Sequence, residues 1–148
     1  MSVYRKVLLA VDLNADSVGI GRRARDLAAL LGAQLTVLHV VEYVPVEPVG
    51  ESMMQPVALF DELAASARQR LATLCADIGV DTNHQRVEVG NVKAEIVRVA
   101  RAMQCDLIVL GARERHGLSI FVNFTEDTVL HAAPCDVLAV RVSGEQVA

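Results

Sequence analysis

The sequence lacks the features of a membrane-spanning, secreted or nucleic-acid-binding chain. No apolar run reaches the roughly 18–20 residues that span a bilayer. The apolar run after Lys6 ends at Asp12, which is too short for a secretory signal with its cleavage site. Fourteen basic residues against 18 acidic ones give a net charge of -4, and such a chain gains nothing from releasing phosphate counterions. We therefore expect a cytoplasmic protein with neither a membrane nor a nucleic acid as its main partner.

Cysteines and catalytic motifs are also scarce. The three cysteines, Cys75, Cys105 and Cys135, are widely spaced and form no Cys-x-x-Cys pair. We expect reduced thiols, buried or half-buried, and no metal site, because zinc needs more Cys and His at ligand spacing. The sequence contains no Gly-x-Ser-x-Gly elbow, His-Glu-x-x-His pair or Walker lysine pattern, and its four histidines are scattered. It thus predicts no catalytic residues, and we expect that the protein is not an enzyme.

The composition is that of one ordinary globular domain covering residues 1–148. Apolar residues make up 53% of the 148 positions and charged residues 22%, enough to bury a core without disulfides or metals. The mean hydropathy of +0.36 is high for a monomer and indicates that a second subunit covers some apolar surface.

Apolar residues follow strand-like spacing in some segments of the chain and helix-like spacing in the segments between them. Short apolar or alternating runs predict five strands, at residues 7–11, 35–41, 84–89, 106–111 and 136–142. His39 falls in the second of these and is expected to be a hydrogen-bonded core residue. Helical spacing predicts four helices: from Asp16 or Ser17 to a stop at Gly32, along 60–78, from 91 to about 103, and from about 121 to 131. Residues 42–55, with two prolines and a glycine, predict a long loop.

This alternation predicts an α/β fold, a single-domain three-layer sandwich around a five-stranded parallel sheet. The fully apolar strands beginning at Val7 and Leu107 should be central, and the alternating strand near Val87 should lie at an edge. The strand order 3-2-1-4-5 satisfies both conditions. It puts the topological switch between the first and fourth strands, so a ligand crevice is expected where Asp12 and Gly111 emerge. The last strand is apolar and has no helix after it, and such an edge favours pairing with a second copy.

Four segments together resemble the universal stress protein family. They are 7–12 with Ser17, 38–40, 106–111 and 129–140, the last containing the Ala133-Pro134-Cys135-Asp136 ending. The resemblance covers nearly the whole chain, in order. It implies an adenine nucleotide alpha hydrolase-like fold, a homodimer joined through the C-terminal strand, and a regulatory or protein-interaction role in the stress response without a defined reaction.

The resemblance also implies where a nucleotide would bind. Many family members hold ATP with Gly-x-x-Gly, about nine residues, then Gly-Ser or Gly-Thr, because small residues let backbone N–H groups approach the phosphates. Here the pattern begins at Gly111, but Glu114 takes the second glycine position and Asn123-Phe124 the Gly-Ser position. A carboxylate repels phosphates, and the Phe124 ring replaces a hydroxyl donor. We predict weak or no ATP binding and no cofactor.

The segment that begins at Asp12 also indicates weak or no ATP binding. Leu13 follows Asp12 where nucleotide-binding members have glycine, which resembles the universal stress protein A-like branch with its degenerate ATP motif. Five residues remain as a vestigial nucleotide crevice: Asp12, Val40, Gly111, Arg113 and Asn123.

Two interpretations stand for most of these residues. Asp12 either contacts a ligand, as its family counterpart does, or is a strand-end carboxylate that caps the next helix or pairs with a cation. Val40 either presents its backbone to adenine or is a core valine. Arg113, with Arg115 and His116, forms either an anion site or a solvated loop.

Three functions follow. The first is a cytoplasmic stress-response regulatory or interaction protein that binds no nucleotide. The alternative is an ATP- or AMP-binding switch. The third is a protein that binds a small anion through Arg113 and Arg115.

Overall fold

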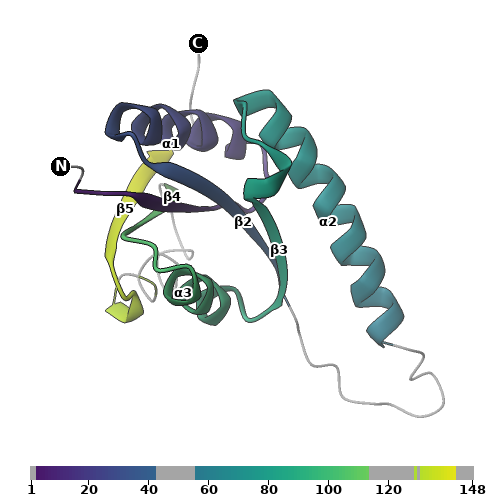
Figure 1. Ribbon diagram of the computed structural model, residues 1–148. Coiled ribbons are helices and arrows are strands. Elements are labelled where there is room, and N and C mark those ends of the chain that lie inside the picture. Colours follow the sequence, from purple (N-terminus) through teal and green to yellow (C-terminus); the bar gives the residue numbers. More distant parts are fainter. Residues whose placement is uncertain (1–2, 43–55, 114–128, 130, 143–148) are drawn as a thin grey trace.

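The computed structural model describes residues 3–42, 56–113, 129 and 131–142. Its centre is a five-stranded sheet with helices on both faces (Figure 1). The elements follow the chain as β1 (Lys6–Ala10), α1 (Ser17–Leu31), β2 (Gln34–Glu42), α2 (Pro56–Ile78), a short 3-10 helix η2 (Thr82–His84), β3 (Gln85–Gly90), α3 (Val92–Ala102), β4 (Leu107–Arg113) and β5 (Asp136–Val142). None of the helices in these ranges combines the length and apolar character needed to cross a bilayer.

The strand order is β3-β2-β1-β4-β5, and every neighbouring pair is parallel. The predicted order 3-2-1-4-5 is confirmed, with β1 central and β3 at an edge. The burial of the side chains in each strand agrees with these central and edge positions. Leu8 and Leu9 of β1 are fully buried, as are Ile108 and Val109 of β4, because side chains on both faces of a central strand meet helices. No residue of β3 is fully buried.

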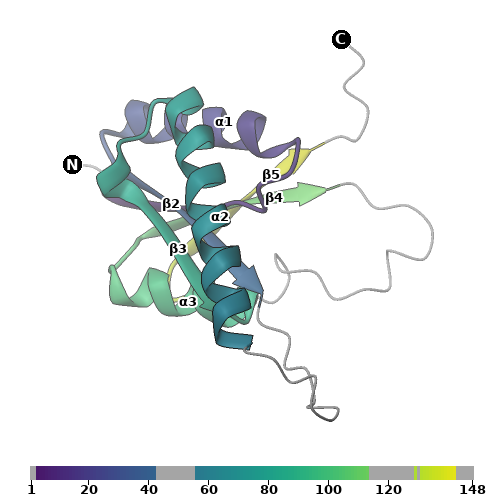
Figure 2. The ribbon, with the colours of Figure 1, turned by 90° about the vertical axis from the view of Figure 1, so that its right-hand side faces the viewer.

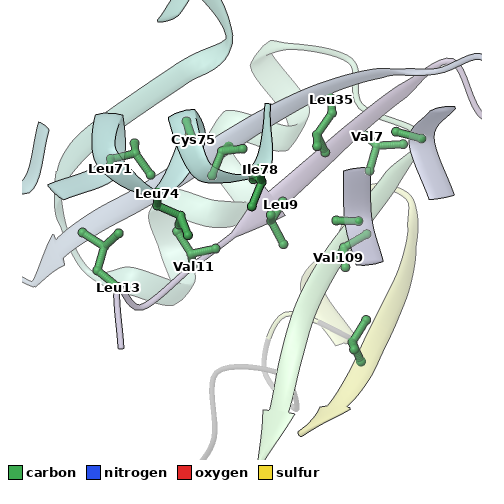
Figure 3. Packing of buried hydrophobic residues seen from close by; sticks show 14 of the residues in the cluster. Val7, Leu9, Val11, Leu13, Leu35, Leu71, Leu74, Cys75, Ile78 and Val109 are labelled. Carbon is green, nitrogen blue, oxygen red and sulfur yellow. The ribbon is translucent and has the colours of Figure 1, made fainter. Parts of the chain in front are cut away.

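The two faces of the sheet carry separate cores. Val7, Leu9 and Val11 point toward α1 and α2, whereas Leu8 points toward α3, as the two-residue period of a strand requires. Figure 3 shows the first core, in which Leu71, Leu74 and Ile78 of α2 reach toward Leu9 and Val11. The helices are thereby fixed on the sheet, and the turn after β1 is fixed with them through Leu13.

The first helix begins and ends close to its predicted limits. Asp16 takes the N-cap position, but its side chain makes no cap hydrogen bond. Gly32 ends the helix with φ of 65°, a left-handed conformation that glycine adopts without steric cost. Gly21 lets the helix approach α2, since an added Cβ would lie 3.0 Å from the Cδ1 atom of Ile78.

Two predicted elements fall largely outside the described residues. Of the predicted loop 42–55, only Glu42 is described, and it is the last residue of β2. Of the predicted helix 121–131, the structure describes Val129 and His131, which are helical.

The prediction of reduced, buried or half-buried thiols is confirmed: Cys75 and Cys105 are buried, Cys135 is half-buried, and all three are free.

Candidate functional site

The carboxyl ends of the strands form one edge of the sheet, at which the described candidate residues lie. In Figure 2 the arrowheads of β4 and β5 leave the sheet on the side away from the N-terminus. The register pairs Leu9 with Val109, so Gly111 lies level with Val11 and beside Asp12. The Asp12 side chain is exposed and Gly111 is half-buried. The topological switch of the sheet therefore brings these two residues together.

The turn after β1 has an unusual backbone at Leu13. Its φ is 61°, a left-handed conformation that costs a non-glycine residue about 1–2 kcal/mol. Two contacts offset this cost. The Leu13 side chain is buried in the core under α2, near Leu71 and Val11 (Figure 3), and the Arg70 guanidinium of α2 donates a hydrogen bond to the Leu13 carbonyl. A leucine thus occupies a position whose conformation favours glycine, and α2 holds it there.

The next residues close the turn into α1. The Ser17 hydroxyl is buried; it accepts from the Asn14 backbone N–H at 3.1 Å and donates to the Asn14 side-chain oxygen at 3.2 Å. The same oxygen accepts from the Asp16 backbone N–H at 3.0 Å. Side chains of this kind commonly satisfy backbone groups ahead of a helix. Ser17 therefore closes the turn that directs Asp12 outward.

His39 of β2 forms a hydrogen bond with the backbone at the end of β1. Its Nδ1 lies 2.8 Å from the Val11 carbonyl oxygen. A carbonyl only accepts, so Nδ1 carries the proton. The prediction that His39 is a hydrogen-bonded core residue is confirmed, although its side chain is half-buried rather than fully buried.

Val40 has a buried side chain in the α3-side core. The pairing of β2 with β1 ends at Leu38, two residues earlier, so the Val40 backbone lies beyond that ladder. The buried side chain fits the interpretation as a core valine. The position of the backbone is also compatible with the other interpretation, in which the Val40 backbone contacts adenine.

The remaining candidates are described only in part or not at all. Arg113 is the last residue of β4, and its backbone pairs in register with Val142. Asn123 lies outside the described residues, as do Glu114, Phe124 and Arg115. The predictions made for the nucleotide loop therefore remain predictions.

A hollow of about 270 Å³ opens beside the turn, between α1 and α2. It is lined on one side by Leu13, Asn14 and Ser17 and on the other by residues of α2 that include Arg70 and Asp77. Within the ranges that the structure describes, no group of three or more His, Cys, Asp or Glu side chains is placed to hold a metal ion. The described edge thus offers exposed carboxylates, among them Asp12, together with backbone groups and a small, mainly apolar hollow, an arrangement that can bind a small ligand.

Sequence reasoning missed the part that α2 plays at this edge. The Arg70 contact joins residues 57 positions apart, and an arginine within a long helix gives no signal of such a contact. The Asn14–Ser17 contacts could have been found, because Asn, Asp and Ser clustered before a helix are typical of side-chain-closed turns.

Comparison with known proteins agrees with this geometry. The model of the "Universal stress protein family" matches residues 3–141. Two similar proteins of Coxiella burnetii are universal stress protein A homolog 2, with 35% identity over 97% of this chain and 99% of its own, and homolog 1, with 37% identity over 93% and 96%. A solved structure described as a universal stress protein in complex with cAMP superimposes with a TM-score of 0.64 at 22% identity, over 93% of this chain and 97% of that one. The chain belongs to the universal stress protein family.

Proposed function

We propose that this protein is a homodimeric, cytoplasmic stress-response protein that regulates or binds other proteins and binds ATP weakly or not at all. The observation that carries the proposal is the outer edge of β5. Among the strands that the structure describes, β5 pairs only with β4, and Leu138 on it is 40% exposed. Open, apolar strand edges are uncommon on monomers because they pair with other chains.

A second copy of the chain is the simplest occupant of this edge. Two β5 strands related by a two-fold axis would continue the sheet antiparallel, which satisfies the outward backbone groups of both copies. The flanking side chains suit such a contact, since Ala139 is small and Arg141 lies exposed near the end of the strand. The high mean hydropathy of the chain has the same explanation.

Weak nucleotide binding is supported by residues at two places. Glu114 and Phe124 stand in the sequence where nucleotide-binding members have glycine and a hydroxyl residue. Leu13, which stands where those members have glycine, is fixed in the core and to Arg70. In the sequence motif, a carboxylate and a bulky ring thus replace the small residues whose backbone N–H groups bind phosphates in nucleotide-binding members.

The alternative is a switch that binds ATP or AMP. One observation favours it: the sheet order brings Asp12 and Gly111 to the same edge, with the Val40 backbone beyond the β1–β2 ladder. The similar fold described in complex with cAMP belongs to another protein, and it makes an adenine nucleotide the first ligand to test. Binding of a small anion through Arg113 and Arg115 is a third candidate, and inorganic phosphate tests it.

The experiment combines light scattering with equilibrium dialysis on the same sample. At micromolar concentration we expect a mass of twice 15.9 kDa and no saturable binding of Mg-ATP, AMP or phosphate. A mass of 15.9 kDa would contradict the dimer. Saturable micromolar binding of Mg-ATP or AMP would instead favour the nucleotide switch, and binding of phosphate alone would favour the anion site.

A further inference from the structure

Two of the three cysteines lie together at the amino edge of the sheet, at the opposite end from the candidate site. Cys105 directly precedes Asp106, and Cys135 directly precedes Asp136, the first residue of β5. Both side chains contribute to the core on the α3 face of the sheet, Cys105 as a buried member and Cys135 packed against it.

The strand register fixes their separation. Leu107 of β4 lies opposite Asp136 of β5, so Cys135 falls opposite Asp106 and one position from Cys105. With strands about 4.8 Å apart and a rise of about 3.3 Å per residue, the two Cα atoms lie about 6 Å apart when this geometry is extended back by two residues to Cys105 and by one to Cys135. Disulfides join Cα atoms about 4.4–6.8 Å apart.

The N-terminal segment holds both cysteines in place. The Asp106 carboxylate accepts hydrogen bonds from the backbone N–H groups of Arg5 and Lys6 at 2.9–3.0 Å. The Tyr4 hydroxyl donates to the Asp136 carboxylate at 2.8 Å. Since one short segment binds the residue after each cysteine, the two thiols keep their relative position, and joining them costs little conformational freedom.

We propose that Cys105 and Cys135 form a thiol–disulfide exchange site that a low-molecular-weight disulfide, such as oxidised glutathione, converts into an intrachain disulfide. The more exposed Cys135 loses its proton and attacks one sulfur of glutathione disulfide, which forms a mixed disulfide and releases one glutathione thiolate. The deprotonated Cys105 then attacks the Cys135 sulfur and displaces the second glutathione. Two protein thiols are oxidised, one disulfide of the oxidant is reduced to two thiols, and the two protons pass to the released thiolates.

The surroundings make this exchange slow near neutral pH. Burial raises the pKa of the Cys105 thiol to about 11. Burial, and then the neighbouring Asp106 and Asp136 carboxylates, raise the pKa of Cys135. Because the thiolate is the attacking species, the rate should rise about tenfold per pH unit between pH 7 and 9. The site would thus respond to sustained rather than brief oxidising conditions.

The proposal is independent of the dimer. Cys135 precedes β5, so the cross-link leaves the outer edge of that strand unchanged. Cys75 serves as an internal control, because it lies fully buried in the other core, across the sheet.

The test incubates the full chain with oxidised glutathione and measures its intact mass without reduction. The wild type and Cys75→Ala should each lose the mass of two hydrogen atoms, with a Cys105–Cys135 peptide found after digestion. Cys105→Ala should stop at one added glutathionyl group on Cys135. Cys135→Ser should stay unmodified. Closing this loop should raise the melting temperature of the oxidised protein by about 5–10 °C.

Two results would overturn the proposal. One is a folded wild type that stays fully reduced throughout the incubation at pH 9. The other is a wild type that keeps a glutathionyl group on Cys135 without resolving it, because that outcome would place the Cys105 sulfur out of reach.

Discussion

The two edges of the sheet are built in opposite ways, although both end the same parallel array. β3 is flanked by α2 and α3 and carries charged side chains: Glu88 bonds Arg86 at 2.8 Å and lies 3.4 Å from Arg98. β5 has its main contacts, among the described elements, with β4. Yet among the described side chains each edge exposes a large apolar one to a similar degree, 38% for Val89 and 40% for Leu138.

This contrast shows that exposure of a single side chain does not identify an assembly surface. Charges and covering helices protect a strand edge from pairing, and β3 has both. Among the described residues, β5 carries charges only near its two ends, at Asp136 and Arg141, and its principal neighbour is β4. We therefore assign folding stability chiefly to the α2–β3 side and assembly to the β5 side, and the four predictions below separate these roles.

The largest effect is expected from the core beneath α2. Leu71→Ala should lower the free energy of unfolding by about 2–5 kcal/mol, because Leu71 is fully buried and truncation leaves a cavity. Urea denaturation at fixed protein concentration measures this change, and the mass of the folded variant should remain that of a dimer. Leu63→Ala, on the exposed side of the same helix, should change the free energy by less than about 0.5 kcal/mol. Equal losses in the two variants would contradict this view of α2.

Substitution at the β5 edge should act on assembly instead. Leu138→Asp places a charge where two strands would meet, and it should weaken the dimer at least about 100-fold, or nearly 3 kcal/mol. Light scattering over a dilution series measures it. Val89→Asp is the matched control, because Val89 is equally exposed on the other edge, and it should leave the dimer intact. Dissociation by the Val89 variant alone would reverse the assignment of the two edges.

Alkaline pH should destabilise the fold through its buried thiols. Burial raises the pKa of Cys75 and Cys105 from the ordinary 9.0 to about 11. The folded chain therefore keeps protons that the unfolded chain releases, so the stabilisation is complete below pH 9 and is lost as the pH rises from 9 to 11. Each thiol should contribute on the order of 2 kcal/mol. In Cys75→Ala the fall in unfolding free energy over this range should be smaller than in the wild type, and the remaining fall should come from Cys105 and Cys135, whose pKa values are also raised; an unchanged fall would contradict the prediction.

The smallest effect is expected from the charges of β3. Glu88→Gln removes the carboxylate between Arg86 and Arg98, and it should cost about 0.5–1 kcal/mol because the arginines are partly exposed. The difference from wild type should shrink at high salt, which screens the pair. Asp26→Asn, which breaks the more exposed pair with Arg25, should cost less. A loss that does not respond to salt would show that packing, rather than charge, is the cause.

The fold could be predicted from the sequence because its strands differ in pattern. The continuous apolar runs at Val7 and Leu107 and the alternation near Val87 correspond to central and edge positions, and the strand order 3-2-1-4-5 satisfies both conditions. The position of Asp12 beside Gly111 followed, since parallel strands bring their carboxyl ends to one edge. The left-handed Leu13 and its contact with Arg70 could not be predicted, because they depend on how α2 packs over the sheet. The hydrogen bond of His39 was expected, but its acceptor, the Val11 carbonyl, depends on how β2 lies against the end of β1.

Hydrogen exchange at β5 tests the central claim most directly. Alternate backbone N–H groups of β5 point away from β4, and pairing with a second copy of the chain would protect them. Their exchange should accelerate when the protein is diluted below its dimer dissociation constant, while exchange in β1 and β4 stays unchanged. Outward N–H groups of β5 that exchange at the same fast rate at every concentration would contradict the account.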